Sequence, residues 1–171
     1  MLSDLSSRFF IEKLESSHVR KSFDCGIETL NTYIQKQATQ DERRHIAVTY
    51  VLYDKQEDKT GGFYTLSSTT IESKYLSDEI TRKLPSYPLI PATLIGRLAI
   101  DKYIQGMGLG EILLMDALHR SYESSKTIAS FAVVVEAINK EAVKFYKKYG
   151  FIDFNMHEKL LYMAMKTIKN L

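Results

Sequence analysis

Three glycines alternate with larger residues in the run Gln105-Gly106-Met107-Gly108-Leu109-Gly110. Glycine adopts positive φ angles readily and lets a ligand approach the backbone closely. The run stands between a predicted strand that ends at Ile100 and a predicted helix that begins near Leu109. Backbone amides at the start of a helix point outward with a partial positive charge, and they bind phosphate groups. The run is therefore a candidate turn for binding a pyrophosphate.

Other interpretations of the glycine run stay open. It could be a flexible entry to a helix that binds no ligand. A P-loop requires Gly-Lys followed by Ser or Thr, which the run lacks, and a dinucleotide fingerprint requires a small residue where Glu111 stands. Glu136, at the end of the next predicted strand, mimics the ribose-binding acid of a Rossmann unit, so that fold remains a distant alternative.

The elements that must position this turn follow from hydrophobic periodicity, which predicts a mixed α/β domain. The prolines at positions 85, 88 and 91 predict a stiff, extended connector over Leu84–Pro91. Gly150 should end the last predicted helix, because glycine accepts left-handed backbone angles there. The predicted strands are Phe9–Leu14, Ala47–Tyr53, Phe63–Ser68, Thr93–Ile100, Phe131–Val135, Phe151–Phe154 and Leu160–Met165. The first predicted helix is marked by an apolar stripe of Ile27, Leu30, Ile34 and Ala38 at helical spacing. The other predicted helices are Ser73–Lys83, Leu109–Tyr122 and Lys140–Tyr149.

Length and composition predict one compact domain over residues 1–171, because 44% of the residues are hydrophobic and 26% are charged. The net charge is +2, so a nucleic acid would have to be bound by a local basic patch. No apolar run reaches about 18 residues, so we expect neither a signal peptide nor a membrane span, and a cytoplasmic location. Cys25 has no disulfide partner, and the histidines lack zinc-ligand spacing, so no metal is expected.

A second motif follows the Phe131–Val135 strand, and it consists of Asn139, Ala142, Phe145, Tyr146, Gly150 and Phe151. Together with the glycine run it resembles the signature of the GNAT acetyltransferases. The resemblance implies an α/β (α+β) fold with a mixed, mostly antiparallel, splayed sheet flanked by helices, and acetyl-CoA as co-substrate. It implies that Tyr146 is the catalytic general acid toward the leaving thiolate. The implied cofactor contacts are Leu98, Ala99, Ile100, Gln105, Gly106, Met107, Gly108, Leu109, Gly110, Glu111, Asn139, Ala142 and Phe145.

A narrower resemblance covers nearly the whole chain. The segments Phe23-x-Cys25-Gly26, Leu30-Asn31-x-Tyr33-Ile34 and Leu84-Pro85-x-Tyr87-Pro88 are similar to the GNAT toxins of bacterial type II toxin-antitoxin pairs. This resemblance implies acetylation of the α-amino group of an aminoacyl-tRNA, which blocks translation, and inhibition by a ribbon-helix-helix antitoxin. A homodimer is expected because two-fold homodimers are common. The alternatives are an acetyltransferase for a small amine or a protein N-terminus with no toxin role, and a binding module without catalysis.

Basic residues cluster at three places, and such clusters are most often solvated surface. If they converged on one cleft, they could neutralise the phosphates of a tRNA acceptor stem. Cations at helix ends also complement the helix dipole, which is a purely structural alternative. Arg97 could be an ordinary surface residue or a substrate contact. The candidate contacts to substrate or RNA are Arg97, Arg43, Arg44, Lys144 and Lys147.

Overall fold

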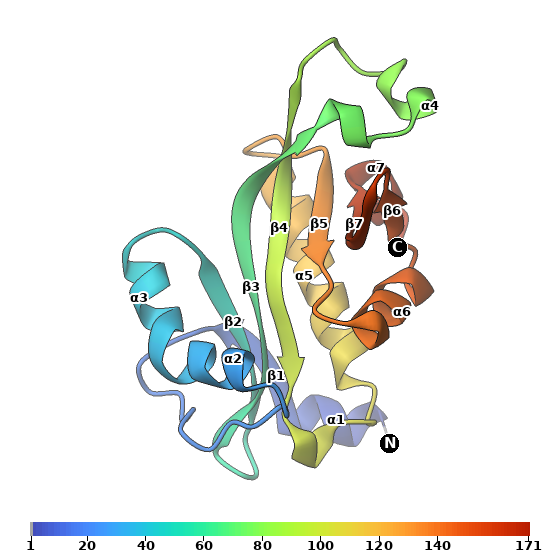
Figure 1. Ribbon diagram of the computed structural model, residues 1–171. Helices are drawn as coiled ribbons and strands as arrows, with labels where there is room; N and C mark the ends of the chain where they lie inside the picture. Colours follow the sequence, from blue (N-terminus) through green and yellow to red (C-terminus); the bar gives the residue numbers. More distant parts are fainter. Residues whose placement is uncertain (1) are drawn as a thin grey trace. The chain divides into compact units, whose positions relative to one another are not determined.

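The computed structural model describes residues 2–171, and Figure 1 shows its strands and helices. Hydrogen-bonded neighbours form a seven-stranded sheet in the order β1-β2-β3-β4-β5-β7-β6. The strands β4 and β5 are parallel, whereas the β1–β2, β2–β3, β5–β7 and β6–β7 pairs are antiparallel. The sheet is therefore mixed and mostly antiparallel, as expected. The strands are β1 Phe9–Lys13, β2 Val48–Asp54, β3 Lys59–Glu72, β4 Leu89–Ile100, β5 Ala132–Glu136, β6 Ile152–Phe154 and β7 His157–Ala164.

The helical segments differ widely in length. The longest is α5, which begins at Leu109 directly after the glycine run. Among the helices of the described residues, none is long and apolar enough to cross a membrane. The segments are α1 Leu2–Arg8, α2 Glu28–Thr32, the π-helix η1 Tyr33–Gln37, α3 Ala38–Arg43, the 3₁₀ helices η2 Ser73–Tyr75 and η3 Lys102–Ile104, α4 Asp78–Thr81, α5 Leu109–Ser125, α6 Lys140–Lys148 and α7 Met165–Ile168.

The chain divides into two compact units. The first unit contains the residues up to Ser67 and the segment Gly96–Ala117, and the second contains Ser68–Ile95 and Leu118–Leu171. This division does not test the prediction of one domain over residues 1–171, which stays a prediction.

The first unit contains the antiparallel strands β1 and β2 and the first part of β3. Its core is formed by buried side chains from β2, β3 and β4, from the η1–α3 segment and from the connection between β1 and α2. The predicted apolar stripe is only partly buried, because Ile34 and Ala38 are buried whereas Ile27 and Leu30 are partly exposed. The π-helix adds one residue to a helical turn and so changes which side chains share a face. The core cluster is Leu14, Phe23, Tyr33, Ile34, Ala38, Val51, Phe63 and Ala99.

The second unit is built on the end of β3, the first part of β4 up to Ile95, and the strands β5, β7 and β6. The strand β5 is apolar and buried except at Glu136, as expected for a strand with neighbours on both sides. Gly150 has a φ angle of +97° just past the end of α6, which confirms the predicted helix stop. The core cluster of this unit is Ile71, Leu76, Ile90, Ala92, Ala132, Val134, Phe154 and Tyr162.

Several predicted boundaries are wrong. The segment Ser73–Lys83 is not one helix but two short pieces, η2 and α4, because Leu76 turns to an extended conformation and is buried in the core. The strand β4 begins at Leu89, so the last three residues of the predicted Leu84–Pro91 connector are part of a strand. Pro91 fits there because the hydrogen bond it makes uses its carbonyl, which accepts from Phe131 N at 2.8 Å.

The remaining differences concern the ends of elements. The strand β3 extends well beyond the predicted Phe63–Ser68 on both sides. The last strand, β7, ends at Ala164, and Met165 starts the short helix α7. Short elements such as α7 lack the several turns that a periodic pattern needs to be visible in a sequence.

Candidate acetyl-transfer site

The glycine run forms an open turn at the start of α5, in the first unit. Gly106 and Gly108 have φ angles of +82° and +78°, which L side chains rarely adopt. A Cβ atom built on either glycine would have no heavy atom within 4 Å. The backbone amides of residues 106–110 donate no hydrogen bond to the part of the chain that the structure describes. We call residues 106–110 the glycine cradle.

The segment immediately before the glycine cradle is firmly held. The side-chain amide of Gln105 donates to the carbonyl oxygens of Ile100, at 2.9 Å, and Cys25, at 3.3 Å. The buried carboxylate of Asp101 accepts from the backbone amides of Asp24, at 2.9 Å, and Tyr103, at 3.2 Å. The side chain of the predicted cofactor residue Gln105 is thus used in hydrogen bonds that fix the turn.

Sequence reasoning missed two glycines that let this segment approach β3. Gly61 is the extra residue of a β-bulge, because Leu52 pairs with Gly62 and Tyr53 pairs with Thr60. Its carbonyl accepts from Asp101 N at 2.8 Å. A Cβ on Gly61 would lie 2.6 Å from a methyl carbon of the 3₁₀ helix η3, so a larger residue does not fit without movement. The signal in the sequence was the glycine pair itself, inside a strand.

Arg97 lies on β4 in the first unit, and its guanidinium stacks on a buried ring. The guanidinium carbon is 3.6 Å from the centroid of Tyr33, which is 1% exposed. A cation held over an aromatic face gains electrostatic attraction to the ring. This contact gives Arg97 a structural function, and its function as a substrate contact stays a prediction.

The second motif lies in the second unit, around α6. Asn139 is the N-cap of α6, and its side-chain oxygen accepts from the amide of Ala142 at 2.9 Å. Phe145 is half-buried and contacts the rings of Tyr146 and Tyr149 edge to face. Asn139 and Ala142 therefore start the helix that carries Tyr146, whatever else they contact.

Tyr146 is 6% exposed, and its ring also packs edge to face on Phe151. Burial raises the pKa of its phenol well above the usual value for tyrosine, so the group keeps its proton across the neutral pH range. No residue within 2–171 provides a hydrogen-bond partner for its hydroxyl group, which is not fully enclosed. A protonated phenol without a protein acceptor can donate to a ligand.

The structure thus divides the predicted site residues between the two units. The first unit brings together the end of β4 and the glycine cradle, and the second unit brings together α6 and the end of β5. In the first unit are Leu98, Ala99, Ile100, Gln105, Gly106, Met107, Gly108, Leu109, Gly110 and Glu111, and in the second are Asn139, Ala142, Phe145 and Tyr146.

The predicted basic contacts differ in whether a carboxylate offsets their charge. Lys144 lies 3.2 Å from Glu141, and Lys147 lies 2.7 Å from Asp153, so both have an acidic neighbour. Arg43 and Arg44 are exposed at the end of α3 and form no ion pair with the described residues.

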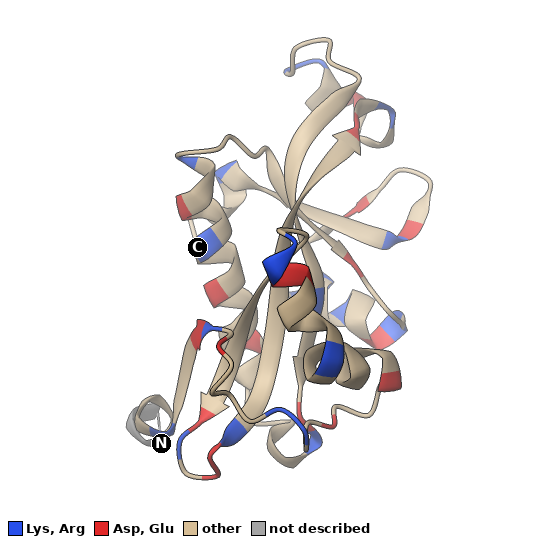
Figure 2. Cartoon of the chain, turned by 90° about the vertical axis from the view of Figure 1, so that its left-hand side faces the viewer, with Lys and Arg blue, Asp and Glu red and all other residues tan. Residues whose placement is uncertain are grey.

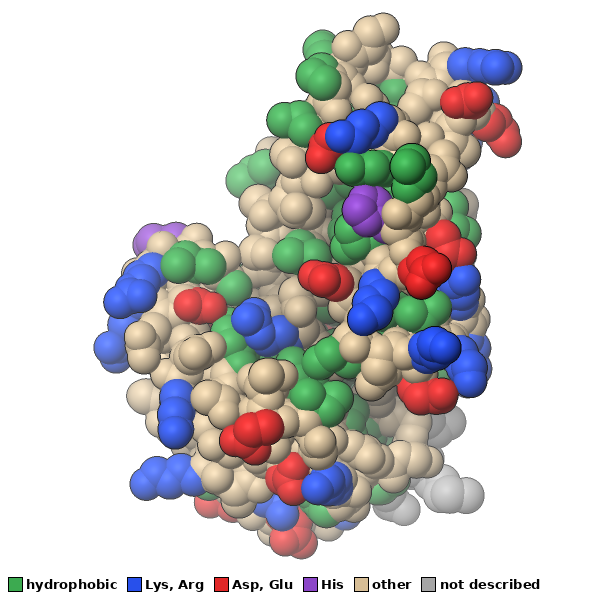
Figure 3. All heavy atoms as spheres, in the orientation of Figure 1, with side chains coloured by type: hydrophobic (Ala, Val, Ile, Leu, Met, Phe, Trp, Pro, Cys, Tyr) green, Lys and Arg blue, Asp and Glu red, His purple; other side chains and the backbone are tan. Residues whose placement is uncertain are grey.

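The basic end of α3 is visible in Figure 2. Figure 3 shows several Lys and Arg side chains gathered on the surface of the α2–η1–α3 segment. The positive charge on this surface of the first unit is more available to a ligand than that of Lys144 and Lys147, which have acidic neighbours.

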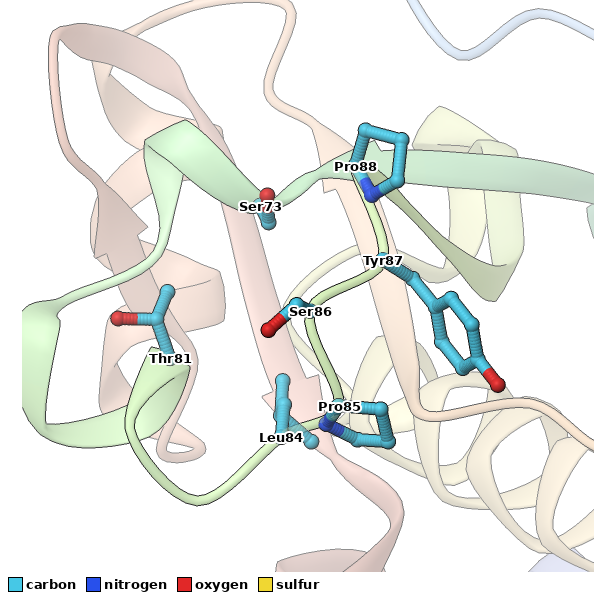
Figure 4. Close-up of a pocket in the computed structure, with 7 residues that line it drawn as sticks. All are labelled: Ser73, Thr81, Leu84, Pro85, Ser86, Tyr87 and Pro88. Atoms are coloured by element: carbon cyan, nitrogen blue, oxygen red, sulfur yellow. The ribbon is translucent and has the colours of Figure 1, made fainter.

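A separate hollow of about 320 Å³ lies in the second unit. Its walls are hydroxyl and apolar side chains, and the ring of Tyr87 extends away from Thr81 (Figure 4). It holds no charged side chain that could bind a phosphate and none of the predicted site residues. Its lining residues are Ser73, Thr81, Leu84, Pro85, Ser86, Tyr87 and Pro88.

The glycine cradle fits a phosphate ligand by three observations. Two glycines leave open space where other residues would place a side chain, the amides have no acceptor in the described chain, and a 17-residue helix begins there. Among residues 2–171, no group of three or more His, Cys, Asp or Glu side chains could hold a metal ion. The backbone amides of the cradle can therefore bind a pyrophosphate.

Comparison with known proteins agrees with this chemistry. Residues 89–160 match the family model described as acetyltransferase (GNAT) domain. A tRNA-acetylating toxin of Mycobacterium tuberculosis (strain ATCC 25618 / H37Rv) is 31% identical over 130 residues, which is 76% of this chain and 76% of that protein.

Two solved structures resemble the chain over nearly its whole length. The structure of AtaT complexed with acetyl-methionyl-tRNAfMet has a TM-score of 0.88 and 32% identity, and the match covers 95% of this chain and 98% of that one. A mutant AtaT toxin bound to acetyl-CoA and to the C-terminus of the antitoxin AtaR has a TM-score of 0.81 and 28% identity, with 95% and 97% covered. The chain therefore belongs to the GNAT acetyltransferase family and is similar to the tRNA-acetylating toxins within it.

Proposed function

We propose that the chain transfers the acetyl group of acetyl-CoA to the α-amino group of an aminoacyl-tRNA, and that it inhibits translation as the toxin of a toxin-antitoxin pair. The observation that carries this proposal is the open glycine cradle at the start of α5, where unused amides meet open space. The likeness to AtaT, whose structure contains acetyl-methionyl-tRNA, supports the choice of acceptor.

The residues of the chain have separate functions in the proposed transfer. The glycine cradle binds the pyrophosphate of acetyl-CoA, which supplies the acetyl group as a thioester. Backbone groups of residues 98–100 orient the thioester and polarise its carbonyl. The amine nitrogen forms a bond to the carbonyl carbon, the carbon–sulfur bond breaks, and Tyr146 donates a proton to the sulfur. The amine loses its own proton to water, and the Tyr146 phenolate regains a proton from water.

The acceptor explains why no strong general base is required. The amine must be neutral to attack, and the α-amine of an aminoacyl ester is less basic than a lysine side chain. A useful fraction is therefore deprotonated near neutral pH. The raised pKa of Tyr146 keeps the acid in its protonated form under the same conditions.

We propose that Arg43 and Arg44 contact the phosphates of the tRNA. Both side chains are exposed and have no carboxylate partner among the described residues, so their charge is available to a phosphate. Lys144 and Lys147 have acidic neighbours, which makes them weaker candidates for the same function. Arg97 remains a proposed contact to the substrate.

The remaining partners are part of the same proposal. An antitoxin with a ribbon-helix-helix domain would inhibit the chain, and the complex of AtaT with the C-terminus of AtaR supports an antitoxin partner. We further propose a homodimer that acts in the cytoplasm, where charged tRNA is found.

The test is acetylation of bulk charged tRNA with labelled acetyl-CoA. The wild type should label charged tRNA and leave deacylated tRNA unlabelled. The Tyr146→Phe variant should keep its affinity for CoA and lose about 100- to 10,000-fold in rate, which is typical when a general acid is removed. Tyr162→Phe is the matched control, since Tyr162 is also a buried tyrosine of the second unit and packs in its core.

Three results would contradict the proposal. Turnover of a free amine or peptide without labelling of charged tRNA would replace the toxin function by the small-substrate alternative. A normal rate for Tyr146→Phe, equal to that of Tyr162→Phe, would show that Tyr146 is not the acid. Binding of CoA without transfer to any amine would leave only a binding module.

A further inference from the structure

Asp54 carries a buried carboxylate at the end of β2, in the first unit. Its side chain is fully enclosed, and Arg8 donates to both of its oxygens, at 3.0 and 2.6 Å. The backbone amides of Gln56 and Glu57 donate to the same carboxylate. Burial disfavours the charged form, but these hydrogen bonds outweigh it and lower the pKa of Asp54 overall. The group is therefore a fixed negative charge at neutral pH.

A fifth donor comes from the segment that leads into the glycine cradle. The hydroxyl of Tyr103, in η3, donates to Asp54 Oδ2 at 3.0 Å. The ring is 37% exposed, and the ammonium of Lys59 lies over it, 3.8 Å from its centroid. Burial and the neighbouring carboxylate raise the pKa of Tyr103, so its hydroxyl remains a donor. The proposed chemistry of the site makes no use of this pair.

Tyr103 lies next to the glycine cradle, so its hydrogen bond to Asp54 connects the cradle segment to β2. It precedes Gly106 by three residues, and its hydroxyl lies directly over the bulged Gly61, where an added Cβ would be 3.0 Å from it. One other bond of the segment, from Asp101 N to Gly61 O, reaches β3, and the rest reach the 24–25 turn or neighbouring backbone. Tyr103 alone connects the segment to the buried Asp54–Arg8 ion pair among the bonds that the described residues form. A glycine-rich turn has many conformations to lose on binding, so a rigid support beside it lowers that entropic cost.

We propose that Tyr103 is a positioning residue for the pyrophosphate of acetyl-CoA, and that the Asp54–Arg8 pair acts through it. The proposal rests on the assignment of the glycine cradle as the cofactor site. Tyr103 does not touch the cofactor in this proposal. It holds η3 on the Gly61 bulge, so that the amides of the cradle are already placed when the ligand arrives.

The test compares a ligand that carries the pyrophosphate with its attached 3'-phosphoadenosine and a ligand that lacks this whole portion. CoA contains it and pantetheine does not, and both dissociation constants are measured with the full chain by calorimetry, or by ligand-observed NMR for the weaker ligand. Tyr103→Phe removes only the hydroxyl. It should weaken CoA binding roughly three- to tenfold, the effect of losing one hydrogen bond of ordinary strength, and leave pantetheine binding unchanged.

Tyr53→Phe is a matched control, because the hydroxyl of Tyr53 donates to the carboxylate of Asp58 at 2.9 Å in the same β2–β3 hairpin, whereas the hydroxyl of Tyr103 donates to Asp54. It should bind both ligands as the wild type does, with a similar change in melting temperature. Unchanged CoA affinity in Tyr103→Phe would overturn the proposal. Equal weakening of CoA and pantetheine, or equal weakening by Tyr53→Phe, would also overturn it, since both would indicate general destabilisation.

These measurements are independent of the acceptor. If the wild type binds CoA but acetylates no charged tRNA, the proposed function fails while the positioning by Tyr103 stands. If the wild type binds no CoA, the assignment of the cradle and the positioning proposal both fail.

Discussion

Replacing Gly62 by alanine adds one methyl group where β3 and β4 approach each other in the first unit. The new Cβ would lie 2.8 Å from Ile100 Cδ1 and 3.0 Å from Leu113 Cδ1, both ends of flexible side chains. It would also lie 3.0 Å from the carbonyl oxygen of Ala99. That oxygen is part of the backbone of β4 and can move only if the strand moves. We therefore expect Gly62→Ala to shift the end of β4.

The size of the effect follows from two opposing contributions. Overpacking of a well-packed site costs about 1–3 kcal/mol. Alanine also restricts the unfolded chain relative to glycine, which stabilises the fold by about 0.4–1 kcal/mol. The steric cost is larger, so the variant should be less stable by about 0.5–2 kcal/mol. For a chain of this length, that corresponds to a fall in melting temperature of roughly 1–8 °C.

The assay is urea unfolding followed by circular dichroism, together with the dissociation constant for CoA. The double variant Gly62→Ala, Ile100→Val removes the methyl carbon at 2.8 Å, so it should recover part of the lost stability relative to Ile100→Val alone. The unrecovered part reports the clash with the carbonyl of Ala99. Stability of Gly62→Ala equal to or above that of the wild type would refute this reasoning, because the entropic gain would then exceed the steric cost.

Three further changes have defined outcomes. Gly108→Asp should weaken CoA binding at least about tenfold, because a carboxylate would stand where the cradle receives a pyrophosphate. Arg43→Gln with Arg44→Gln should weaken binding of charged tRNA and lower the slope of log K against log salt by roughly 1–2, as filter binding at several salt concentrations would show. Asp24→Asn should flatten the acid limb of an unfolding curve, because the hydrogen bond from Lys102 lowers the pKa of Asp24 from 3.8 to about 2. Its carboxylate thus stabilises the fold above about pH 4, and this contribution is lost as the pH falls through about 2.

Each of these predictions has its own control. Gly108→Ala shares the strain of a φ angle of +78° without the charge, and CoA affinity equal to that of Gly108→Asp would contradict the electrostatic argument. Lys144→Gln with Lys147→Gln removes two cations that already have acidic neighbours, and an equal or greater loss of tRNA binding would move the RNA surface to α6. An unchanged acid limb in Asp24→Asn would show that the exposed pair with Lys102 contributes nothing measurable.

The sequence predicted the parts of the site that depend on local patterns. The glycine run required positive φ angles, and Gly106 and Gly108 have them. The strand before the run, the helix after it and the stop at Gly150 also follow from periodicity and glycine chemistry. The structure adds that the side chains of Gln105 and Asn139 bond to the protein itself, which a motif alone does not reveal.

Contacts between distant residues were beyond the sequence. The glycine pair at positions 61 and 62 indicates a close approach to the backbone, but nothing near it indicates that the approaching segment lies about 40 residues later. The partnership of Tyr103 with Asp54 has the same origin, since the two residues lie 49 positions apart. The prediction of one helix over Ser73–Lys83 was wrong for a related reason. The burial of Leu76 in the core, a tertiary contact, overrides the local helical pattern.

The discontinuity of the first unit has a consequence for protein synthesis. Ala99 belongs to the same core cluster as Val51 and Phe63, yet it is made only after the intervening Ser68–Ile95 segment of the second unit. At about 5–20 residues per second, a ribosome needs seconds to add that stretch. During this interval the early strands cannot complete their core, and the glycine cradle does not yet exist. We therefore expect nascent chains and premature termination products that end before residue 110 to lack acetyl-CoA binding.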